Sequence, residues 1–388
     1  MIALHPCFFR LICCLFALSM LQANIAMSED SEVKTLQKEL NLPAIKQEMK
    51  PSRLLEIIDL DWKSEIDAET DEEEKRLMKA VLKHIIEAAD FILADSKVEE
   101  KTALKAVQHK MQALGLLART GDTTASVQAV AMAKQLQQDK RPLLAREGNL
   151  IVLSNRLREI PKMNQQQRDA FIEELMAFFS SSPMTKREIQ IAQVTSQVFE
   201  RAGKTDSAQI ILRKTARLLE QSSKKEWKQI ANQFKGTARR YGLPGHPMKL
   251  SGKTLDGKTI DIKDFKGKVV LVQFWASWCT YCLQEMPHLL KLYHTYHEDG
   301  FEIIGVNLDD SAERARKIIE DAQLPWPQIF NSQIDTMGMK NPNATYYGIS
   351  ALPQCILIDR KGNVITLQAR GKILNQELER LFILSKQQ

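Results

Sequence analysis

The stretch "GKVVLVQFWASWCTYCLQEMPHLLKLY", residues 267–293, sets two cysteines between two different hydrophobic patterns. Before the cysteines, Val269–Trp275 belongs to an apolar run of the kind that forms a buried central strand. After them, the pattern predicts a helix that ends at Gly300. Cys279 and Cys282 are therefore expected at the start of a helix that directly follows a buried strand.

This position gives the two sulfurs different roles. Peptide dipoles and free N–H groups at a helix start favour an anion, so the pKa of the Cys279 thiol should be lowered. The thiolate is the nucleophile in disulfide exchange. Cys282 lies one turn later on the same helix face, where it can attack a mixed disulfide and release the product. The spacing therefore predicts a redox dithiol in which Cys279 attacks and Cys282 resolves.

Other uses of a cysteine pair fit the sequence less well. A zinc site needs four ligands, and the only ligand-like spacing nearby is His294 with His297, later on the same helix. A copper-delivery site would have wider cysteine spacing and a partner His. A thiol peroxidase would have Thr or Ser where this chain has Ala276. No metal and no other cofactor is therefore expected.

The first residues have the features of an export signal. Arg10 supplies a positive charge, Leu11–Leu21 is apolar, and small residues before Ala23 or Ala26 suit a cleavage site. An apolar stretch of this length rises only about 16 Å as a helix, roughly half of a bilayer's hydrocarbon core. We therefore expect a cleaved signal peptide over residues 1–26 and an exported, periplasmic or extracytoplasmic protein, with a membrane anchor less favoured.

Cleavage would leave Cys279, Cys282 and Cys355 in a compartment where disulfides persist. Three cysteines are an odd number, and two of them are too close in sequence to brace distant parts of a fold. The disulfide framework of a small secreted domain is thus absent. A purely structural staple is the weaker interpretation.

The length of the chain and its hydrophobic patterns indicate more than one domain. With 388 residues, two or three domains are expected, and the net charge of +6 is spread along the chain, which argues against a nucleic-acid partner. Residues 27–240 show helical periodicity and no strand-like alternation. They predict an all-α domain, either a helical bundle or an array of helix hairpins, that matches no repeat family we can name.

Two neighbouring segments illustrate this helical pattern. Residues 187–203 have an apolar stripe, and residues 205–222 have another, with Gly203 as a helix C-cap between them. The predicted buried positions are Ile191, Val194, Val198 and Phe199 in the first segment and Ile211, Leu212, Ala216 and Leu219 in the second. Amphipathic helices joined by so short a link predict an antiparallel hairpin.

The texture changes at "YGLPGHP", residues 241–247, where Gly and Pro break the helical pattern. This stretch is predicted to be a linker. Residues 248–388 then alternate apolar runs with amphipathic segments, in the order strand, helix, strand, helix, strand, strand, helix. This order predicts an α/β domain around a central sheet.

The motifs of this second half resemble the thioredoxin-fold proteins of the TlpA/ResA type, which are exported thiol–disulfide oxidoreductases. The resemblance rests on "WCTYC", "GFEIIGVNLDD" and "ALPQCILIDRKGNVI", and it spans roughly Gly245 to the C-terminus. It implies that Cys279 and Cys282 are the redox pair and that the Leu352–Pro353 bond is cis. It also implies that Trp278, Leu352 and Pro353 contact the substrate.

The resemblance assigns two further positions. Glu285 matches a glutamate that ResA-like proteins keep near the cysteines, as a proton acceptor for the resolving thiol; the alternative is a surface residue in the first turns of a helix. Gln273 stands where thioredoxins carry a buried Asp, and an amide cannot accept that proton. Cys355 is expected to be a buried, inert thiol, with a third redox cysteine as the alternative.

The sequence therefore predicts an exported oxidoreductase that exchanges the Cys279–Cys282 pair with protein disulfides. Thr280 and Tyr281, between the cysteines, do not set the redox direction, but the family commonly reduces clients such as apocytochromes. Reductant is the expected direction, and a membrane electron donor would then recycle the pair. The alternative is a binding or scaffold protein that acts through its helical domain, with the thioredoxin-like domain secondary.

Overall fold

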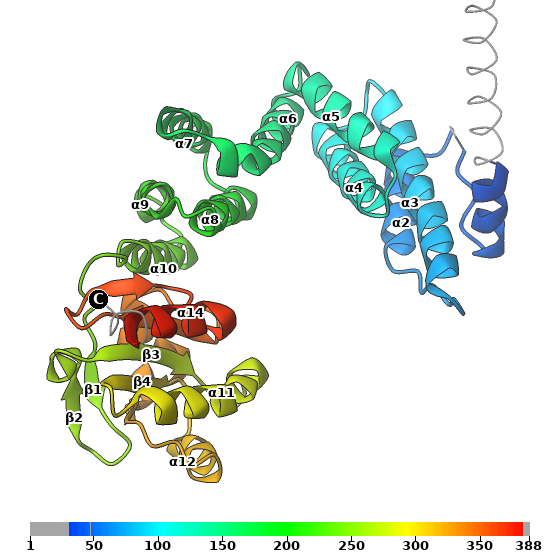
Figure 1. The fold of residues 1–388 in the computed structure, drawn as a ribbon. Coiled ribbons are helices and arrows are strands. Elements are labelled where there is room, and N and C mark those ends of the chain that lie inside the picture. The colour runs from blue at the N-terminus through cyan, green and yellow to red at the C-terminus, as the bar shows by residue number, and fades with distance from the viewer. Residues whose placement is uncertain (1–30, 47, 383–388) are drawn as a thin grey trace, which may run out of the picture. The chain divides into compact units, whose positions relative to one another are not determined.

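The computed structural model describes residues 31–46 and 48–382, which form two compact units divided after Arg156 (Figure 1). The predicted signal peptide, residues 1–26, lies outside the described residues. Among the described helices, none has both the length and the apolar character needed to cross a bilayer. Multi-domain organisation is confirmed, with an all-α N-terminal region and a C-terminal α/β thioredoxin-like fold.

The first unit consists of helices joined by short turns. After a helix over residues 31–39 come α2 (Pro51–Asp61), α3 (Asp71–Ala94), α4 (Glu100–Arg119), α5 (Thr123–Gln137) and α6 (Pro142–Asn155). Helices adjacent in sequence pack as pairs, and their core includes Ile58, Ile85 and Leu114. A buried polar contact adds to this packing, because His84 Nδ1 lies 2.7 Å from Asp61 Oδ2.

The second unit begins with four more helices of this kind. They are α7 (Gln165–Ser180), α8 (Lys186–Arg201), α9 (Thr205–Glu220) and α10 (Lys225–Tyr241). Helix α9 packs against α7, α8 and α10. The predicted stripe of α9 is confirmed, since all four of its residues are buried.

The predicted stripe of α8 is partly wrong. Phe199 is buried, but Val194 is 38% exposed, and the buried face runs instead through Ile189 and Ala192. The reason is that small polar residues, Thr195 among them, occupy the packed face. A stripe inferred from apolar residues alone is therefore displaced around the helix.

The rest of the second unit contains the sheet. Its elements are β1 (Ser251–Lys253), β2 (Thr259–Asp261), β3 (Val269–Trp275), α11 (Thr280–Tyr296), β4 (Phe301–Asn307), α12 (Ala312–Asp321), β5 (Gln328–Ile329), α13 (Pro342–Tyr346), β6 (Gln354–Ile358), β7 (Val364–Thr366) and α14 (Gly371–Phe382). Five strands lie in the order β5-β4-β3-β6-β7. Strands β3, β4 and β5 are parallel to one another, β6 is antiparallel to β3, and β7 is antiparallel to β6. The predicted strands are confirmed, while the two-residue β5 was not predicted.

Strand β3 lies at the centre of this sheet, and all of its residues are buried. Leu271 and Trp275 share a core cluster with residues of α11 and α14, and these two helices lie over the same face of the sheet (Figure 1). This packing fixes α11, and with it the cysteines at its start, against the end of β3.

Helix α10 packs directly onto the thioredoxin-like part of the same unit. Gly236 lies so close to Gly348 that an added Cβ would come within 2.5 Å of the Gly348 nitrogen. The guanidinium of Arg239 stacks over the Tyr346 ring, 3.8 Å from its centroid. Residues 241–247, the predicted linker, form backbone hydrogen bonds with β7, including Gly245 N to Val364 O at 2.8 Å. The compact units thus divide after Arg156, within the helical domain that the sequence predicts over 27–240.

Candidate active site

The two cysteines form a disulfide where β3 gives way to α11. Cys279 and Cys282 have an S–S distance of 2.03 Å and a Cα–Cα distance of 5.2 Å. Cys279 is the N-cap of α11, and the backbone N–H of Cys282 donates to its Sγ at 3.2 Å. A free N–H group of the helix start therefore points at this sulfur, as it would at a thiolate.

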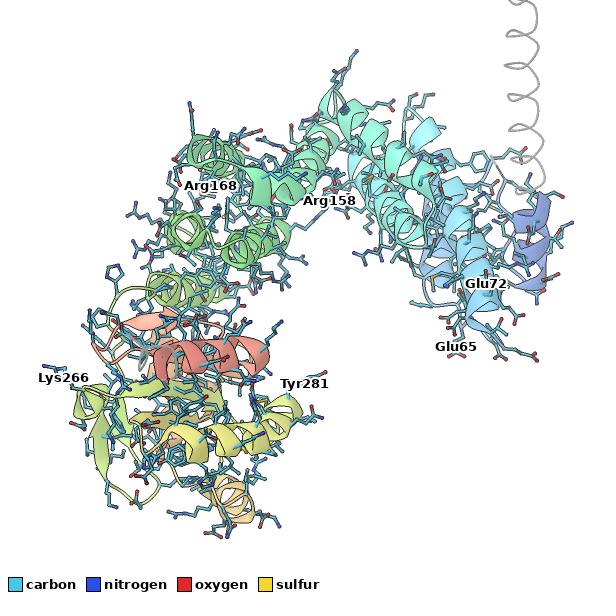
Figure 2. All side chains as sticks on the ribbon, in the orientation of Figure 1. Glu65, Glu72, Arg158, Arg168, Lys266 and Tyr281 are labelled. Atoms are coloured by element: carbon cyan, nitrogen blue, oxygen red, sulfur yellow. A yellow bond between two sulfur atoms is a disulfide. The ribbon has the colours of Figure 1, made fainter. Side chains whose placement is uncertain are left out.

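The two sulfurs differ in their access to solvent. Cys279 is 6% exposed and Cys282 is fully buried. Exposed aromatic rings flank the pair, because Trp278 is 55% and Tyr281 70% exposed, and Figure 2 shows Tyr281 projecting from the start of α11. An external thiolate would therefore meet the sulfur of Cys279 first.

The strand next to β3 brings Leu352 and Pro353 to the same end of the sheet. The Leu352–Pro353 bond is cis, as the resemblance implies. Phe274 pairs with Gln354 in the antiparallel register, which sets Pro353 opposite Trp275, the last residue of β3. Leu352 packs against the core cluster that contains both cysteines. The substrate contacts expected of Trp278, Leu352 and Pro353 stay predictions.

Glu285 lies one turn after Cys282, and its side chain is only 9% exposed. Arg370 Nε donates to its Oε2 at 2.9 Å. Sequence reasoning did not find Arg370, because it lies 85 residues away in sequence, just before α14. The role of Glu285 as a proton acceptor stays a prediction.

Gln273 and Cys355 lie side by side beneath this site. They are paired residues of β3 and β6, and both are fully buried. Among the described residues, the amide of Gln273 has no hydrogen-bond partner. Cys355 is a free thiol whose pKa is raised, mainly by burial and further by the charge of Glu285, while Arg370 acts in the opposite direction. The expectation of a buried thiol is confirmed.

A metal site does not emerge from the described part of the chain. Nowhere in residues 31–46 and 48–382 do three or more His, Cys, Asp or Glu side chains gather as metal ligands would. The disulfide at the start of α11 can itself undergo thiol–disulfide exchange.

Comparison with known proteins bears directly on that chemistry. Residues 244–366 match the AhpC/TSA family. A thiol-disulfide oxidoreductase ResA from Bacillus thuringiensis subsp. konkukian is 34% identical over 125 residues, which cover 32% of this chain and 68% of the relative. This chain belongs to the ResA-like thiol-disulfide oxidoreductases.

Further relatives extend the comparison. The thiol-disulfide oxidoreductase ResA of Geobacillus thermodenitrificans is 34% identical over 128 residues, 32% of this chain and 70% of the relative. Among solved structures, the thioredoxin domain of a thiol-disulfide oxidoreductase from Bacteroides vulgatus is 34% identical, covers 36% of this chain and 97% of its own, and has a TM-score of 0.33. By its similarity to the ResA relatives the chain is a thiol-disulfide oxidoreductase, and its N-terminal helices precede the matched residues 244–366.

Proposed function

We propose that this oxidoreductase reduces disulfides of exported client proteins with the Cys279–Cys282 dithiol. The observation that carries the proposal is the unequal pair at the start of α11, in which Cys279 is the more exposed sulfur and Cys282 is buried behind it. An accessible nucleophile and a protected resolving thiol are what a two-step exchange requires.

The exchange proceeds in two steps, each of which forms one disulfide bond and breaks another. The Cys279 thiolate attacks one sulfur of the client disulfide, so that a mixed disulfide forms and the other client sulfur leaves as a thiolate. Cys282 then loses its proton, with Glu285 as acceptor, and attacks Cys279. The Cys279–Cys282 disulfide forms, and the client leaves as a dithiol after two electrons have passed to it.

The client chain binds across Trp278, Leu352 and Pro353 in this proposal. Trp278 offers an exposed aromatic surface next to Cys279, and Leu352 and Pro353 lie at the neighbouring strand end. An extended client segment with apolar residues beside its cysteine suits such a surface. Clients of the apocytochrome kind follow from the family resemblance.

The proposed setting is outside the cytoplasm. Residues 1–26 would direct export, and the oxidised pair would be returned to a dithiol by the dithiol of a membrane electron donor. Without such a donor, each molecule would reduce one client disulfide and stop. The sequence features of the first residues and the family resemblance support this setting.

A trapping experiment tests the exchange. We expect Cys282→Ser to accumulate a mixed disulfide with a peptide that carries one internal disulfide, because Cys279 attacks but nothing resolves the product. Cys279→Ser should form no adduct, and Cys355→Ala should turn over normally as the matched control. Adducts are counted by mass spectrometry. An adduct on Cys355, or none in Cys282→Ser, would contradict the assignment.

The reduction potential of the pair tests the direction. Equilibration with dithiothreitol or glutathione buffers, followed by mass-tagging of free thiols, should give a value near or below about −270 mV, as in thioredoxin. A value near about −120 mV, as in a strong oxidant, would instead indicate disulfide insertion.

A further inference from the structure

A buried carboxylate lies at the strand end next to the redox pair. Asp309 is 1% exposed and follows β4, whose last residue, Asn307, pairs with Trp275 at the end of β3. Parallel strands end at the same edge of a sheet, so Asp309 reaches the edge from which the cysteines emerge. The exchange as described above makes no use of this group.

The carboxylate is bonded mainly to the turn that precedes the cysteines. The backbone N–H of Ser277 donates to its two oxygens at 3.1 and 3.0 Å, and the Ser277 hydroxyl donates to Oδ1 at 2.7 Å. Asn307 Nδ2 donates to Oδ2 at 2.7 Å. All of these donors are neutral, and within the described residues no Lys, Arg or His forms a salt bridge with Asp309.

The turn between β3 and α11 determines the position of the nucleophile, Cys279. Ser277 is the second residue before Cys279, and the Cys279 N–H donates to Ala276 O at 3.1 Å within the same turn. On the other side, Leu308 N donates to Trp275 O at 2.8 Å. The residues between β3 and α11 are thus fastened to the end of β4, and Trp278 and Cys279 follow directly from the fastened residue.

We propose that Asp309 is a positioning residue for disulfide exchange, acting through Ser277 on Cys279. It has two effects. Its hydrogen bonds hold the turn, so that Cys279 stays at the N-cap of α11 and Trp278 stays beside it. Its negative charge, in a buried and weakly screened place, disfavours a thiolate on Cys279. Since the thiolate belongs to the dithiol form, this charge makes the pair a stronger reductant. The inference rests on the exchange proposed above.

The test compares full-length variants. Asp309→Asn removes the charge and keeps the shape, while Ser277→Ala keeps the charge and removes one hydrogen bond. Asp310→Asn is the matched control, because Asp310 is the next residue, its side chain is 71% exposed, and it pairs with Arg314 instead. Two quantities are measured, the equilibrium constant of the pair with glutathione and the rate of attack on the peptide disulfide.

We expect Asp309→Asn to shift the equilibrium about tenfold toward the dithiol, which is about 30 mV for a two-electron couple. Ser277→Ala should leave the equilibrium within twofold of wild type and slow the attack severalfold. Asp310→Asn should change neither quantity.

A folded Asp309→Asn variant with the wild-type equilibrium would overturn the inference, as would an equal shift in Asp310→Asn. Circular dichroism shows whether Asp309→Asn folds. If it does not fold, the test rests on Ser277→Ala, and a wild-type rate of attack in that variant overturns the inference. Failure of the proposed function looks different, because then the wild-type protein itself would show no reversible couple or would not reduce the peptide.

Discussion

At the scale of single residues, the three cysteines differ in their position in the fold and in their exposure. Cys279 is 6% exposed at the N-cap of α11, and Cys282, in the first turn of α11, and Cys355, on β6, are both fully buried. Burial disfavours the thiolate, which is the reactive form, and Cys355 lies on β6 whereas Cys282 is in the first turn of α11. We therefore expect Cys355 to be the less reactive thiol although it shares a core cluster with the redox pair.

This difference predicts a pH dependence of stability. Burial raises the pKa of Cys355 above its ordinary value of 9.0. Below that pH, the thiol is neutral in both the folded and the unfolded chain. Above it, the unfolded chain releases a proton that the folded chain retains, so the free energy of unfolding falls as pH rises, by up to about 1.4 kcal/mol per pH unit.

Urea unfolding of wild type and Cys355→Ala at several pH values between 8 and about 10.5 checks this, with the Cys279–Cys282 disulfide intact in both. The wild type should lose stability relative to the variant as pH rises. Parallel curves would show that Cys355 titrates alike in the folded and unfolded states.

Glu285 gives a second prediction at this scale. If its carboxylate accepts the proton of Cys282, Glu285→Gln should slow resolution of the mixed disulfide by about 10²-fold and leave the attack by Cys279 unchanged. Glu377→Gln is the matched control, since Glu377 also pairs with an arginine, Arg380, at 2.7 Å. Stopped-flow measurement of the rate of attack by Cys279 and of the rate of resolution by Cys282 checks this prediction. Equal effects of the two variants would leave Glu285 only its ion pair with Arg370 and would contradict its role as proton acceptor.

At the scale of elements, local patterns carried most of the fold. The apolar run of β3 and the helical spacing after it each act within a few residues, and both are present in the structure. The two-residue β5 has too little pattern to detect, and it exists because β4 is there to pair with it.

The site shows the same division between local and distant information. The cysteines were found because their spacing and helix position are local. Arg370 and Asp309 were not, although "NLDD" ends a quoted motif, because their partners Glu285 and Ser277 lie far away in sequence. A single sequence does not show which polar side chains meet across a sheet edge.

The contact between α10 and the segment after α13 yields a prediction for an element. Gly236 is inside α10, where alanine is favoured by backbone entropy, but an added Cβ would be 2.5 Å from the Gly348 nitrogen and 2.9 Å from the Thr345 oxygen. We expect Gly236→Ala to lower the free energy of unfolding by about 1–3 kcal/mol, the usual effect of overpacking.

Gly115 in α4 offers the matched control, because a Cβ there would meet nothing within 4 Å. Gly115→Ala should raise stability by about 0.5–1 kcal/mol. Urea unfolding of each variant measures both effects. Stabilisation by Gly236→Ala would mean that α10 and the Gly348 segment do not pack as closely as described.

At the scale of the whole molecule, the question is where one folding unit ends. The hydrophobic pattern of the sequence alone places the domain boundary at residues 241–247, where helical periodicity is followed by predicted strands. Contacts divide it after Arg156, because α7 to α10 belong with the sheet. The two divisions predict different behaviour of fragments.

A fragment of residues 157–388 should fold and exchange disulfides at the wild-type rate, within about twofold. A fragment of residues 248–388 would lose α10 and the hydrogen bonds that Thr237, Arg239 and Arg240 donate to carbonyls of residues 346–348. These side chains form four such bonds, and the fragment would also lose the backbone bonds between residues 241–247 and β7. At about 1 kcal/mol for each bond, it should be less stable than the longer fragment by at least about 4 kcal/mol. Urea unfolding of both oxidised fragments compares them directly. Equal stabilities of the two fragments would place the boundary of the folding unit at residues 241–247 instead.

The same fragments separate chemistry from binding. If exchange is the protein's work, residues 157–388 should reduce a folded client protein as fast as the full chain does, since they hold the complete site. If the first helical unit captures clients, this fragment should keep its rate with a short peptide and lose rate with the protein. The ratio of the two rates therefore decides whether residues 31–156 serve recognition, whatever the redox pair does by itself.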